Sequence, residues 1–562
     1  MLDPSPNSDA PHAPLSPRLV WLIFAVTALA VLSVAFGPWL GGEFVWDDVY
    51  LVQNNTALLA PSGAWEIVRQ DLWGQAKGDP SQLYHPVPML TVWAQAQLTG
   101  MSLAAFRLVN VLTHGLVGAA LLALLLRLGL SGPVAAAAAL LVLVHPSATE
   151  PVMWITGRHD TIAALFSLLA LLCWPRLTSP EEEPPLPRAH AQAAVAGLCC
   201  LLAFWSKEPY IVTPALLVAL HGVTLITRRR GDLKPAALRA ASFALWPAAA
   251  LAVGIAVRTA LDIPLGNNQM SQPITTHVVN FASISAHLLG QLLTFSNGAT
   301  ITPYAPLPGW AVALVWAGWF AAVGGGALLA WRLAEDRRAL LVPVGVIWVG
   351  FALAPHLVSV PSIGFYGNRY AYFALLGLAV ALAPLAEIAL ERARPELRRV
   401  SLGVAVVLVV GLAGLTSSWA SLWQSDLSLY SYDVTRDPNN GFAQYHLGHA
   451  IRRHHGCERA LPHFVRATQL TPRYDRAWHN SAGCLINLKR FKEALPAARE
   501  AARLRPTDAG SAFNLGLSLA MTGQLPEAEQ ALTRAVRLDP GHGRAAGLLK
   551  AVRGELGRSG AP

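Results

Sequence analysis

The sequence carries little charge. Only 13% of its 562 residues are Asp, Glu, Lys or Arg, about half the usual share of a soluble domain, and 54% are hydrophobic. Charged side chains are missing altogether from residues 19–42, 128–149 and 263–331. A helix that crosses a bilayer needs about 20 apolar residues. These absences exclude an ordinary soluble protein and predict a membrane protein with several spans.

Cysteine is also scarce, with five residues in the chain. Three of them lie in or beside apolar runs, which argues against a disulfide framework. Cys457 and Cys484 lie in the polar C-terminal part, and their spacing leaves open whether they pair. The net charge of +9 comes largely from short basic loops between spans, a pattern typical of membrane topology rather than of nucleic-acid binding.

The apolar runs predict eleven spans. They lie near residues 19–40, 105–126, 130–146, 160–175, 191–206, 209–227, 240–258, 309–331, 339–357, 370–387 and 400–419. With this number, the basic loops 227–239, 332–338 and 391–399 all fall on one side, together with the N-terminal tail 1–18. Basic loops mark the cytoplasmic side. The C-terminus is then expected outside the cytoplasm.

One further segment, 278–295, is apolar enough to resemble a twelfth span. It contains Asn280, His287 and Gln291, and a twelfth crossing would move two basic loops to the outside. We therefore expect this segment to lie in the membrane interface or to re-enter within the protein.

The C-terminal part repeats itself. Prolines recur every 34 residues, at 438, 472, 506 and 540, and small residues recur between them. This period is typical of tetratricopeptide helix pairs. The predicted parts are a linker 421–437, repeats 438–471, 472–505 and 506–539, and a capping helix 541–555. The expected fold is all-α, a membrane domain (19–420) of about eleven helices followed by an α-solenoid.

This topology places the loops 41–104, 145–160 and 259–308 outside, together with the shorter connections 206–210 and 362–372. Many charged residues gather in the first two loops and in the two connections. They are Asp47, Asp48, Glu150, Arg158, Asp160, Lys207, Glu208 and Arg369. Each has an ordinary explanation, such as a helix cap or a local ion pair. Together on one side, acids and bases at a membrane edge are typical of a site that combines acid–base chemistry with anion binding.

Four stretches carry a family resemblance. They are "FVWDDVYLVQNN", "LVHPSATEPVMWITGRHDTIAALFSLLALL", "SKEPYIVTPALL" and "WQSDLSLYSYDVTRDPNNGFAQYHLG". With the repeats that follow, the chain resembles the transmembrane, tetratricopeptide-containing glycosyltransferases, a family with protein O-mannosyltransferases among its members, and more closely its bacterial-type relatives. The resemblance covers roughly residues 40–550 and implies the GT-C fold.

The resemblance implies site roles. The family's catalytic acidic pair falls on Asp47 and Asp48, with Asp47 as general base, and the donor is a sugar on a polyprenyl or dolichyl phosphate. Residues expected to bind the donor phosphate or substrate are Arg158, Lys207, Arg369, Glu150, Asp160, Glu208 and His85. The chain departs from the family pattern at His85 and Asn368, where relatives favour an arginine and an acid, so the sugar is left open.

The expected chemistry suits these residues. A Ser or Thr hydroxyl needs a base within hydrogen-bond reach, and adjacent carboxylates at a poorly hydrated edge should raise one pKa. A leaving lipid phosphate needs cations, and direct displacement inverts the anomeric centre. No metal is required. Mg²⁺ or Mn²⁺ on Asp47 and Asp48 is the alternative, and no zinc-type ligand set occurs.

The repeats are expected to bind a protein or peptide acceptor close to the outer-loop site. Candidate contacts at matching repeat positions are His446, Asn480 and Asn514, although such residues often bond only within the repeat stack. The predicted location is a bacterial inner membrane with the repeats outside. Competing functions are a glycan ligase or polymerase with lipid-linked donors, a non-catalytic scaffold and, less favoured, a transporter.

Overall fold

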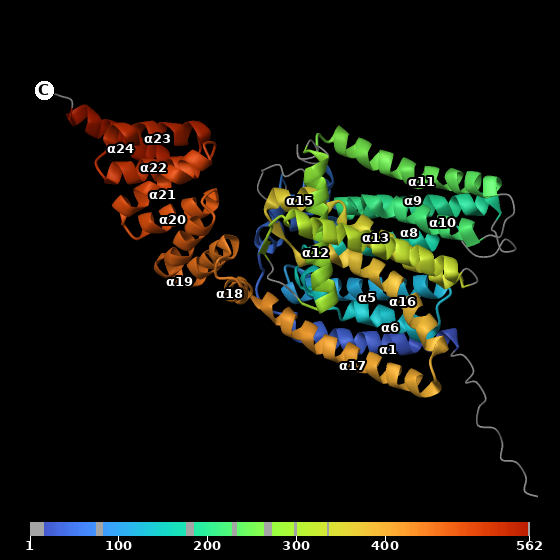
Figure 1. The fold of residues 1–562 in the computed structure, drawn as a ribbon. Helices are drawn as coiled ribbons and strands as arrows, with labels where there is room; N and C mark the ends of the chain where they lie inside the picture. The colour runs from blue at the N-terminus through green and yellow to red at the C-terminus, as the bar shows by residue number, and fades with distance from the viewer. Residues whose placement is uncertain are drawn as a thin grey trace, which may run out of the picture. The chain divides into compact units, whose positions relative to one another are not determined.

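The computed structural model describes residues 16–74, 83–175, 185–227, 233–263, 272–296, 301–333 and 336–559. These residues are overwhelmingly helical and divide into two units, shown in Figure 1. The first unit contains the described residues up to 296 and from 304 to 424, and the second contains 301–303 and 425–559. The predicted all-α fold is confirmed. The two strands, β1 (Thr302–Pro303) and β2 (Phe365–Tyr366), have two residues each.

The first unit is a helical membrane domain. Its helices are α1 (Pro17–Phe36), α2 (Gly63–Arg69), α4 (Pro86–Thr99), α5 (Leu103–Arg127), α6 (Gly132–Leu143), α7 (Thr149–Met153), α8 (Arg158–Cys173), α9 (Leu186–Ser206), α10 (Thr213–Thr227), α11 (Leu233–Ala260), α12 (Ile274–Thr294), α13 (Gly309–Arg332), α14 (Leu341–Leu353), α15 (His356–Ile363), α16 (Tyr372–Arg392) and α17 (Pro395–Ala420). Capping residues in the sequence determine where several of these helices begin. Ser16 caps α1, which has Pro17 in its first turn, and Ser102 caps α5.

Among the described residues, eight helical segments are long and apolar enough to cross a membrane. They coincide with eight of the eleven predicted spans. A ninth predicted span, 130–146, coincides with α6. This helix and the following segment Pro146–Met153 are separated by a short break at which the helix axis bends by 54°. The last two coincide with α8 and α10, which have 16 and 15 residues and are shorter than the eight. The chain is a multi-pass membrane protein.

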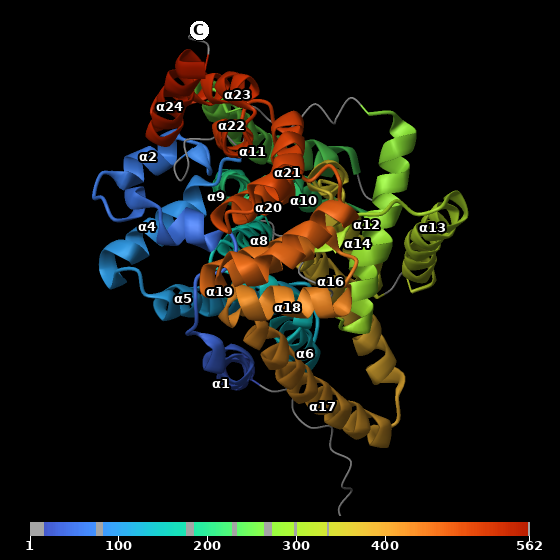
Figure 2. The same ribbon diagram turned by 90° about the vertical axis from the view of Figure 1, so that its left-hand side faces the viewer.

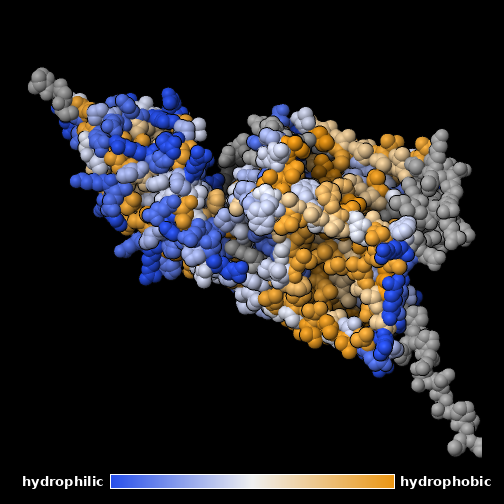
Figure 3. Space-filling model, in the orientation of Figure 1, coloured by the Kyte–Doolittle hydropathy of each residue, from blue (hydrophilic) through white to orange (hydrophobic). Residues whose placement is uncertain are grey.

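Apolar side chains cover the outside of this unit. On α13, Trp310, Phe320 and Trp331 are 70–74% exposed, as expected for side chains that contact lipid. Figure 3 shows hydrophobic surface over α13 and α17 and a hydrophilic edge where α16 meets α17. The second unit is mostly hydrophilic in the same view. This contrast agrees with a membrane domain joined to a water-soluble one.

Helix α12 covers the segment that resembled a twelfth span, and it is not among the candidate spans. Figures 1 and 2 show it running across the direction of α13 rather than along it. Its polar side chains face protein. Asn280 accepts from the Tyr304 hydroxyl at 2.5 Å and donates to the Leu357 carbonyl, and Ser283 accepts from the Leu307 amide at 2.9 Å. These contacts agree with the expectation of a helix that does not span, which stays a prediction.

The predicted basic loops that the structure describes lie at one end of the bundle. Glu387 accepts from the Ser131 amide at 2.9 Å and from Arg338 at 3.2 Å, and Arg338 also pairs with Glu391 at 2.5 Å. The connections after α5, α13 and α16 therefore share one end. This agrees with the predicted number of crossings between them. Residues 1–15 and 228–232, parts of the predicted tail and first basic loop, lie outside the described residues.

The second unit is the repeat domain. Its helices are α18 (Asp426–Arg436), α19 (Gly441–Leu470), α20 (Asp475–Asn487), α21 (Phe491–Leu504), α22 (Ala509–Met521), α23 (Leu525–Leu538) and α24 (Gly543–Ser559). Helix α19 is two helices joined at Gly456, where φ is 81°. Three helix pairs and α24 therefore coincide with the three predicted repeats and the capping helix. The small residues Ala460, Ala494 and Ala528 are fully buried, so paired helices approach closely.

The segment expected as a linker, 421–437, contains a helix. Ser425 and Ser428 form a capping box at the start of α18, and this helix packs on α19. Residues 301–303 join the same unit because Ile301 bonds to Asp433 and Asn440. The short polar motif around Ser425 thus starts the repeat unit earlier than the proline period indicates.

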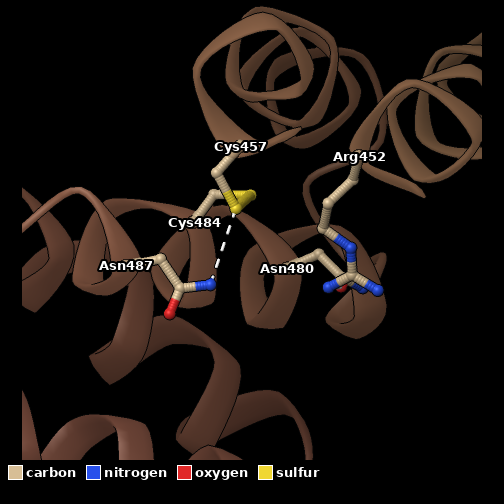
Figure 4. Close-up of a disulfide and its surroundings, with 5 residues drawn as sticks. All are labelled: Arg452, Cys457, Asn480, Cys484 and Asn487. Atoms are coloured by element: carbon tan, nitrogen blue, oxygen red, sulfur yellow. Dashed lines mark hydrogen bonds between the residues drawn. A yellow bond between two sulfur atoms is a disulfide. The ribbon is translucent and has the colours of Figure 1, made fainter. Parts of the chain in front are cut away.

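Cys457 of α19 and Cys484 of α20 form a disulfide, shown in Figure 4. Their Cα atoms are 5.0 Å apart. The bond ties the first repeat to the second and settles the pairing that the sequence left open.

Candidate active site

Helix α5 holds the backbone of the loop after α1 and of the loop between α7 and α8 through Arg107 and Asn110. Arg107 is fully buried and donates only to backbone carbonyls, those of Trp39, Gly41, Glu43, Met153 and Trp423. Asn110 donates to the carbonyls of Val152 and Trp154 at 3.1 and 2.9 Å. Two polar side chains inside an apolar span therefore fix the loop after α1 and the loop between α7 and α8.

Asp48 is fully buried and belongs to this framework. One carboxylate oxygen accepts from the Ile155 amide at 3.0 Å. The other accepts from the Thr156 amide at 3.0 Å and from its hydroxyl at 3.1 Å. These donors lie 107 and 108 residues away in sequence. Asp48 thus anchors the loop after α1 on the loop between α7 and α8.

The electrostatics of Asp48 also differ from the expectation. Its pKa is raised to about 7 because burial disfavours the charged carboxylate, while the bonds from Ile155 and Thr156 and the charge of Arg107 oppose the rise. From the sequence, a raised pKa is expected from repulsion between the adjacent acids Asp47 and Asp48. The cause in the structure is desolvation.

Asp47 is half-buried rather than buried. Its carbonyl accepts from the amides of Tyr50 and Leu51, at 3.0 and 2.8 Å, in the tight turn that follows. The preceding Trp46 stacks on Trp154, with ring centres 5.1 Å apart. Of the acidic pair, Asp47 is therefore the more accessible carboxylate.

Arg369 lies on the same aromatic surface. Its guanidinium carbon is 5.3 Å from the centre of the Trp46 ring and 5.0 Å from that of Trp154. It pairs with buried Glu150 and donates to the Tyr370 hydroxyl at 3.1 Å. A cation from the short helical turn before α16 is thereby placed beside the residue that precedes Asp47.

Lys207 pairs with Asp160 at 2.5 Å, and its Nζ lies 5.6 Å from the centre of the Tyr370 ring. Burial lowers the pKa of Lys207, and Asp160 opposes this shift. Tyr370 therefore contacts both Lys207 and Arg369, so the two ion pairs form one cluster.

A third polar group adjoins this cluster. Glu208 binds His85 at 2.5 Å and Arg258 at 2.7 Å, and His85 lies 3.1 Å from His159. Burial raises the pKa of Glu208, but His85 and Arg258 outweigh it and hold the pKa at about 2. Glu208 is therefore charged at neutral pH.

Arg158 points away from these groups. It is fully buried, and its guanidinium donates to Asn110 at 2.6 Å and to Gln95 and the Phe106 carbonyl at 2.8 Å each. These contacts join α8 to α4 and α5. Phosphate binding by Arg158 stays a prediction that this arrangement does not favour.

No group of three or more His, Cys, Asp or Glu residues suited to a metal ion occurs in the described ranges. Both oxygens of Asp48 already accept from N–H or O–H donors. The Mg²⁺ or Mn²⁺ site on the acidic pair stays a prediction that the bonding of Asp48 does not favour.

The three candidate residues of the repeats differ in their contacts. His446 stacks on Tyr430 at 4.8 Å, and Asn480 accepts from Arg452 at 2.8 Å, a pair drawn in Figure 4. The side-chain amide of Asn514 makes no hydrogen bond with the described residues. The ordinary role inside the stack therefore fits His446 and Asn480 but not Asn514.

The sequence analysis did not single out Trp46, Trp154, Arg107 or Asn110. A tryptophan precedes the polar group in both "VWDD" and "MWITGRHD", which was a visible signal for the first two. Arginine and asparagine within the apolar run of α5 were a signal for the others, because polar residues inside spans usually serve a site.

Comparison with known proteins agrees with this architecture. The "Tetratricopeptide repeat" family model matches residues 445–509 and 490–543. "Protein O-mannosyl-transferase TMTC3" from Mus musculus is 24% identical over 580 residues, covering 94% of this chain and 61% of the relative. The Homo sapiens protein of that name is also 24% identical, covering 88% and 58%. The chain is thus similar, over most of its own length, to proteins named as O-mannosyl-transferases.

Other proteins with such names are more similar over shorter stretches. "Protein O-mannosyl-transferase TMTC1" from Mus musculus is 36% identical over 151 residues, which cover 25% of this chain and 16% of that protein. The chain spans about three fifths of the length of the two TMTC3 proteins. Among solved structures, "MamA 41-end from Desulfovibrio magneticus RS-1" is 25% identical, covers 24% of this chain and 86% of its own, and has a TM-score of 0.20. At that TM-score the likeness carries no argument about function.

Proposed function

We propose that the chain is an integral-membrane glycosyltransferase that moves a sugar, mannose in the first instance, from a polyprenyl-phosphate donor to a Ser or Thr hydroxyl of a protein. The observation that carries this proposal is the position of Asp47. It is a half-buried carboxylate that directly follows Trp46, and the ring of Trp46 contacts the Arg369 guanidinium. Arg369 and Lys207 both contact Tyr370, so two cations belong to the cluster next to this loop. The names of the full-length relatives support the reaction class.

Asp47 is the general base. It accepts the proton of the acceptor hydroxyl as the oxygen attacks the anomeric carbon, and the bond from that carbon to the donor phosphate breaks. Base catalysis of this kind contributes on the order of 10²–10⁴-fold in rate. Attack opposite the leaving phosphate inverts the anomeric centre. Asp48, buried and fully bonded, supports the loop that carries Asp47.

Arg369 and Lys207 stabilise the phosphate that leaves. Lys207 has three N–H donors and one hydrogen-bond partner among the described residues, Asp160. Arg369 has five donors and uses its side chain for Glu150 and Tyr370. Donors fixed in advance around a developing charge lower its energy without reorganisation. Glu150 and Asp160 hold both cations in place.

The acceptor approaches from outside the cytoplasm and is bound by the repeats, which raise its concentration at Asp47. The membrane is proposed to be a bacterial inner membrane, with the repeats on its outer side. A glycan ligase or polymerase uses the same donor class, so the two functions differ in the acceptor. A scaffold has no need for a base at position 47.

The test uses the full chain in lipid with polyprenyl-phosphate mannose and a Ser/Thr peptide. Mass spectrometry of the peptide should show added hexose, and Asp47→Asn should lower turnover by about 10²–10⁴-fold. Glu66→Gln is the matched control, because Glu66 is an exposed acid of the same outer loop. Near-native turnover in Asp47→Asn would refute the base assignment. Transfer to glycans but to no peptide would favour the ligase.

A further inference from the structure

The two residues on either side of Asp47 in the first outer loop contact three consecutive residues of another loop. Trp46 stacks on Trp154, with the rings 17° from parallel. Asp48 accepts from the amides of Ile155 and Thr156. Asp47 lies between these two attachments. Its backbone is therefore held on both sides by the same segment, 154–156.

The backbone conformation of Trp46 is energetically unfavourable by itself. Its φ is 54°, in the left-handed region, which side chains with a Cβ atom rarely adopt. Within the described ranges only three other non-glycine residues have positive φ. Such conformations persist where surrounding contacts determine them, often at functional sites. The local sequence therefore does not favour this geometry, and tertiary contacts must maintain it.

The contacts that maintain it come from distant segments. Besides Trp154, the ring of Trp46 has Phe365 at 6.2 Å and the Arg369 guanidinium at 5.3 Å. Arg369 is itself fixed by Glu150. A cation over aromatic faces is attractive, and more so when it is poorly hydrated. The orientation of the backbone before Asp47 thus depends on Trp46 and on the cation that holds its ring.

We propose that Trp46 is a positioning residue: its ring, clamped by contacts with Trp154 and with the Arg369 guanidinium that touches both rings, sets the backbone direction at Asp47 and so aims that carboxylate. This rests on the proposed function of Asp47 and deepens it. The clamp couples the base to Arg369, a proposed phosphate-binding residue, so that base and phosphate site keep a fixed geometry. Misplacement of a catalytic group by about 1 Å is enough to lower rates on the order of 10²-fold.

The first test needs no substrate. The full chain carrying Asp47→Cys is treated with a charged methanethiosulfonate reagent, alone and combined with Trp46→Gly, Trp46→Phe or Trp65→Ala. Glycine tolerates the left-handed backbone but removes the ring. Trp65 is the matched control, a tryptophan of the same loop that is 60% exposed, with the Arg69 guanidinium 4.2 Å from its ring centre.

Loosening of the loop should raise the labelling rate at position 47 by about fivefold or more with Trp46→Gly, less with Trp46→Phe, and within about twofold of the parent with Trp65→Ala. Gel filtration identifies variants that fail to fold, and Trp46→Phe then carries the comparison. An unchanged rate in the folded Trp46 variants would overturn the proposal, whatever reaction the chain performs.

The second test measures turnover with polyprenyl-phosphate mannose and a peptide. Trp46→Gly should lower kcat by about 10- to 100-fold, leave the donor KM within about twofold, and be partly restored by Trp46→Phe. A purely structural role would reduce the amount of folded protein but not turnover per folded molecule, and that result would also overturn the proposal. Normal turnover in Asp47→Asn would instead remove the proposed function and leave the labelling result standing.

Discussion

Substitution of Asp48 by asparagine separates support of the loop from catalysis. The carboxylate of Asp48 accepts three hydrogen bonds, two from backbone amides and one from the Thr156 hydroxyl. An asparagine side chain has one acceptor oxygen and one NH₂ group. If its oxygen keeps both bonds to Thr156, its NH₂ group faces the N–H group of Ile155. Both are hydrogen-bond donors, so the buried N–H of Ile155 is left without an acceptor.

The magnitude follows from that mismatch. A buried donor left without an acceptor costs about 1–3 kcal/mol. We expect Asp48→Asn to lower the free energy that holds the loop by this amount. At about 1.4 kcal/mol per tenfold, this corresponds to roughly 5- to 150-fold in the opening equilibrium. Thr156→Val, which removes only the hydroxyl bond at 3.1 Å, should cost about 0.5–1.5 kcal/mol.

Hydrogen exchange of the full chain in lipid measures this directly. Protection of the peptide that contains Ile155 and Thr156 should fall by the stated factor in Asp48→Asn and by less in Thr156→Val. Turnover should fall in both variants, because Asp47 is attached through Asp48. Unchanged protection with strongly reduced turnover would refute the reasoning and place Asp48 in the chemistry itself.

The raised pKa of Asp48 should also make the stability of the folded chain depend on pH. Burial raises the pKa of Asp48 from its ordinary value of 3.8 to about 7, so the folded chain binds this proton more tightly than the unfolded chain. The stability from this group is fully present below about pH 4 and is lost as the pH rises through about 7. The melting temperature of Asp48→Asn should therefore change less with pH, between about pH 4 and pH 7, than that of the parent chain. An equal slope in the parent and the variant would contradict the assignment.

Two further predictions concern the repeat unit. If the repeats lie in an oxidising compartment, Cys457 and Cys484 should resist alkylation in intact membranes until a reductant is added. Loss of their disulfide, which closes a separation of 27 residues, should lower the free energy of unfolding of the repeats by about 3–4 kcal/mol in the chain-entropy model. Alkylation without reductant would argue against that location. If the repeats bind the acceptor, Asn514→Ala should raise the KM for a protein acceptor by about 2- to 12-fold and leave the KM for a short peptide unchanged. Asn480→Ala should chiefly destabilise the repeats. Equal effects of Asn514→Ala on both substrates would contradict a role of Asn514 in acceptor binding.

The sequence alone determined the elements and their order. Uncharged runs long enough for a bilayer predicted the spans, and a 34-residue proline period predicted the three helix pairs. Polar residues in segment 278–295 set it apart from the predicted spans, and α12 is not among the candidate spans of the described residues. These inferences succeed because helix formation, hydrophobic burial and repeat stacking leave periodic traces within short windows.

Only the tertiary structure decided what the acids and bases contact. Asp47 and Asp48 are adjacent in sequence, yet one is buried by residues more than 100 positions away and the other is not. Arg158 turns into the bundle, while Arg369 and Lys207 pair with Glu150 and Asp160. Burial, ion pairing and the clamp around Trp46 depend on which distant segments meet. Charge spacing along one chain carries no record of those meetings, which are fixed by the packing of the whole bundle.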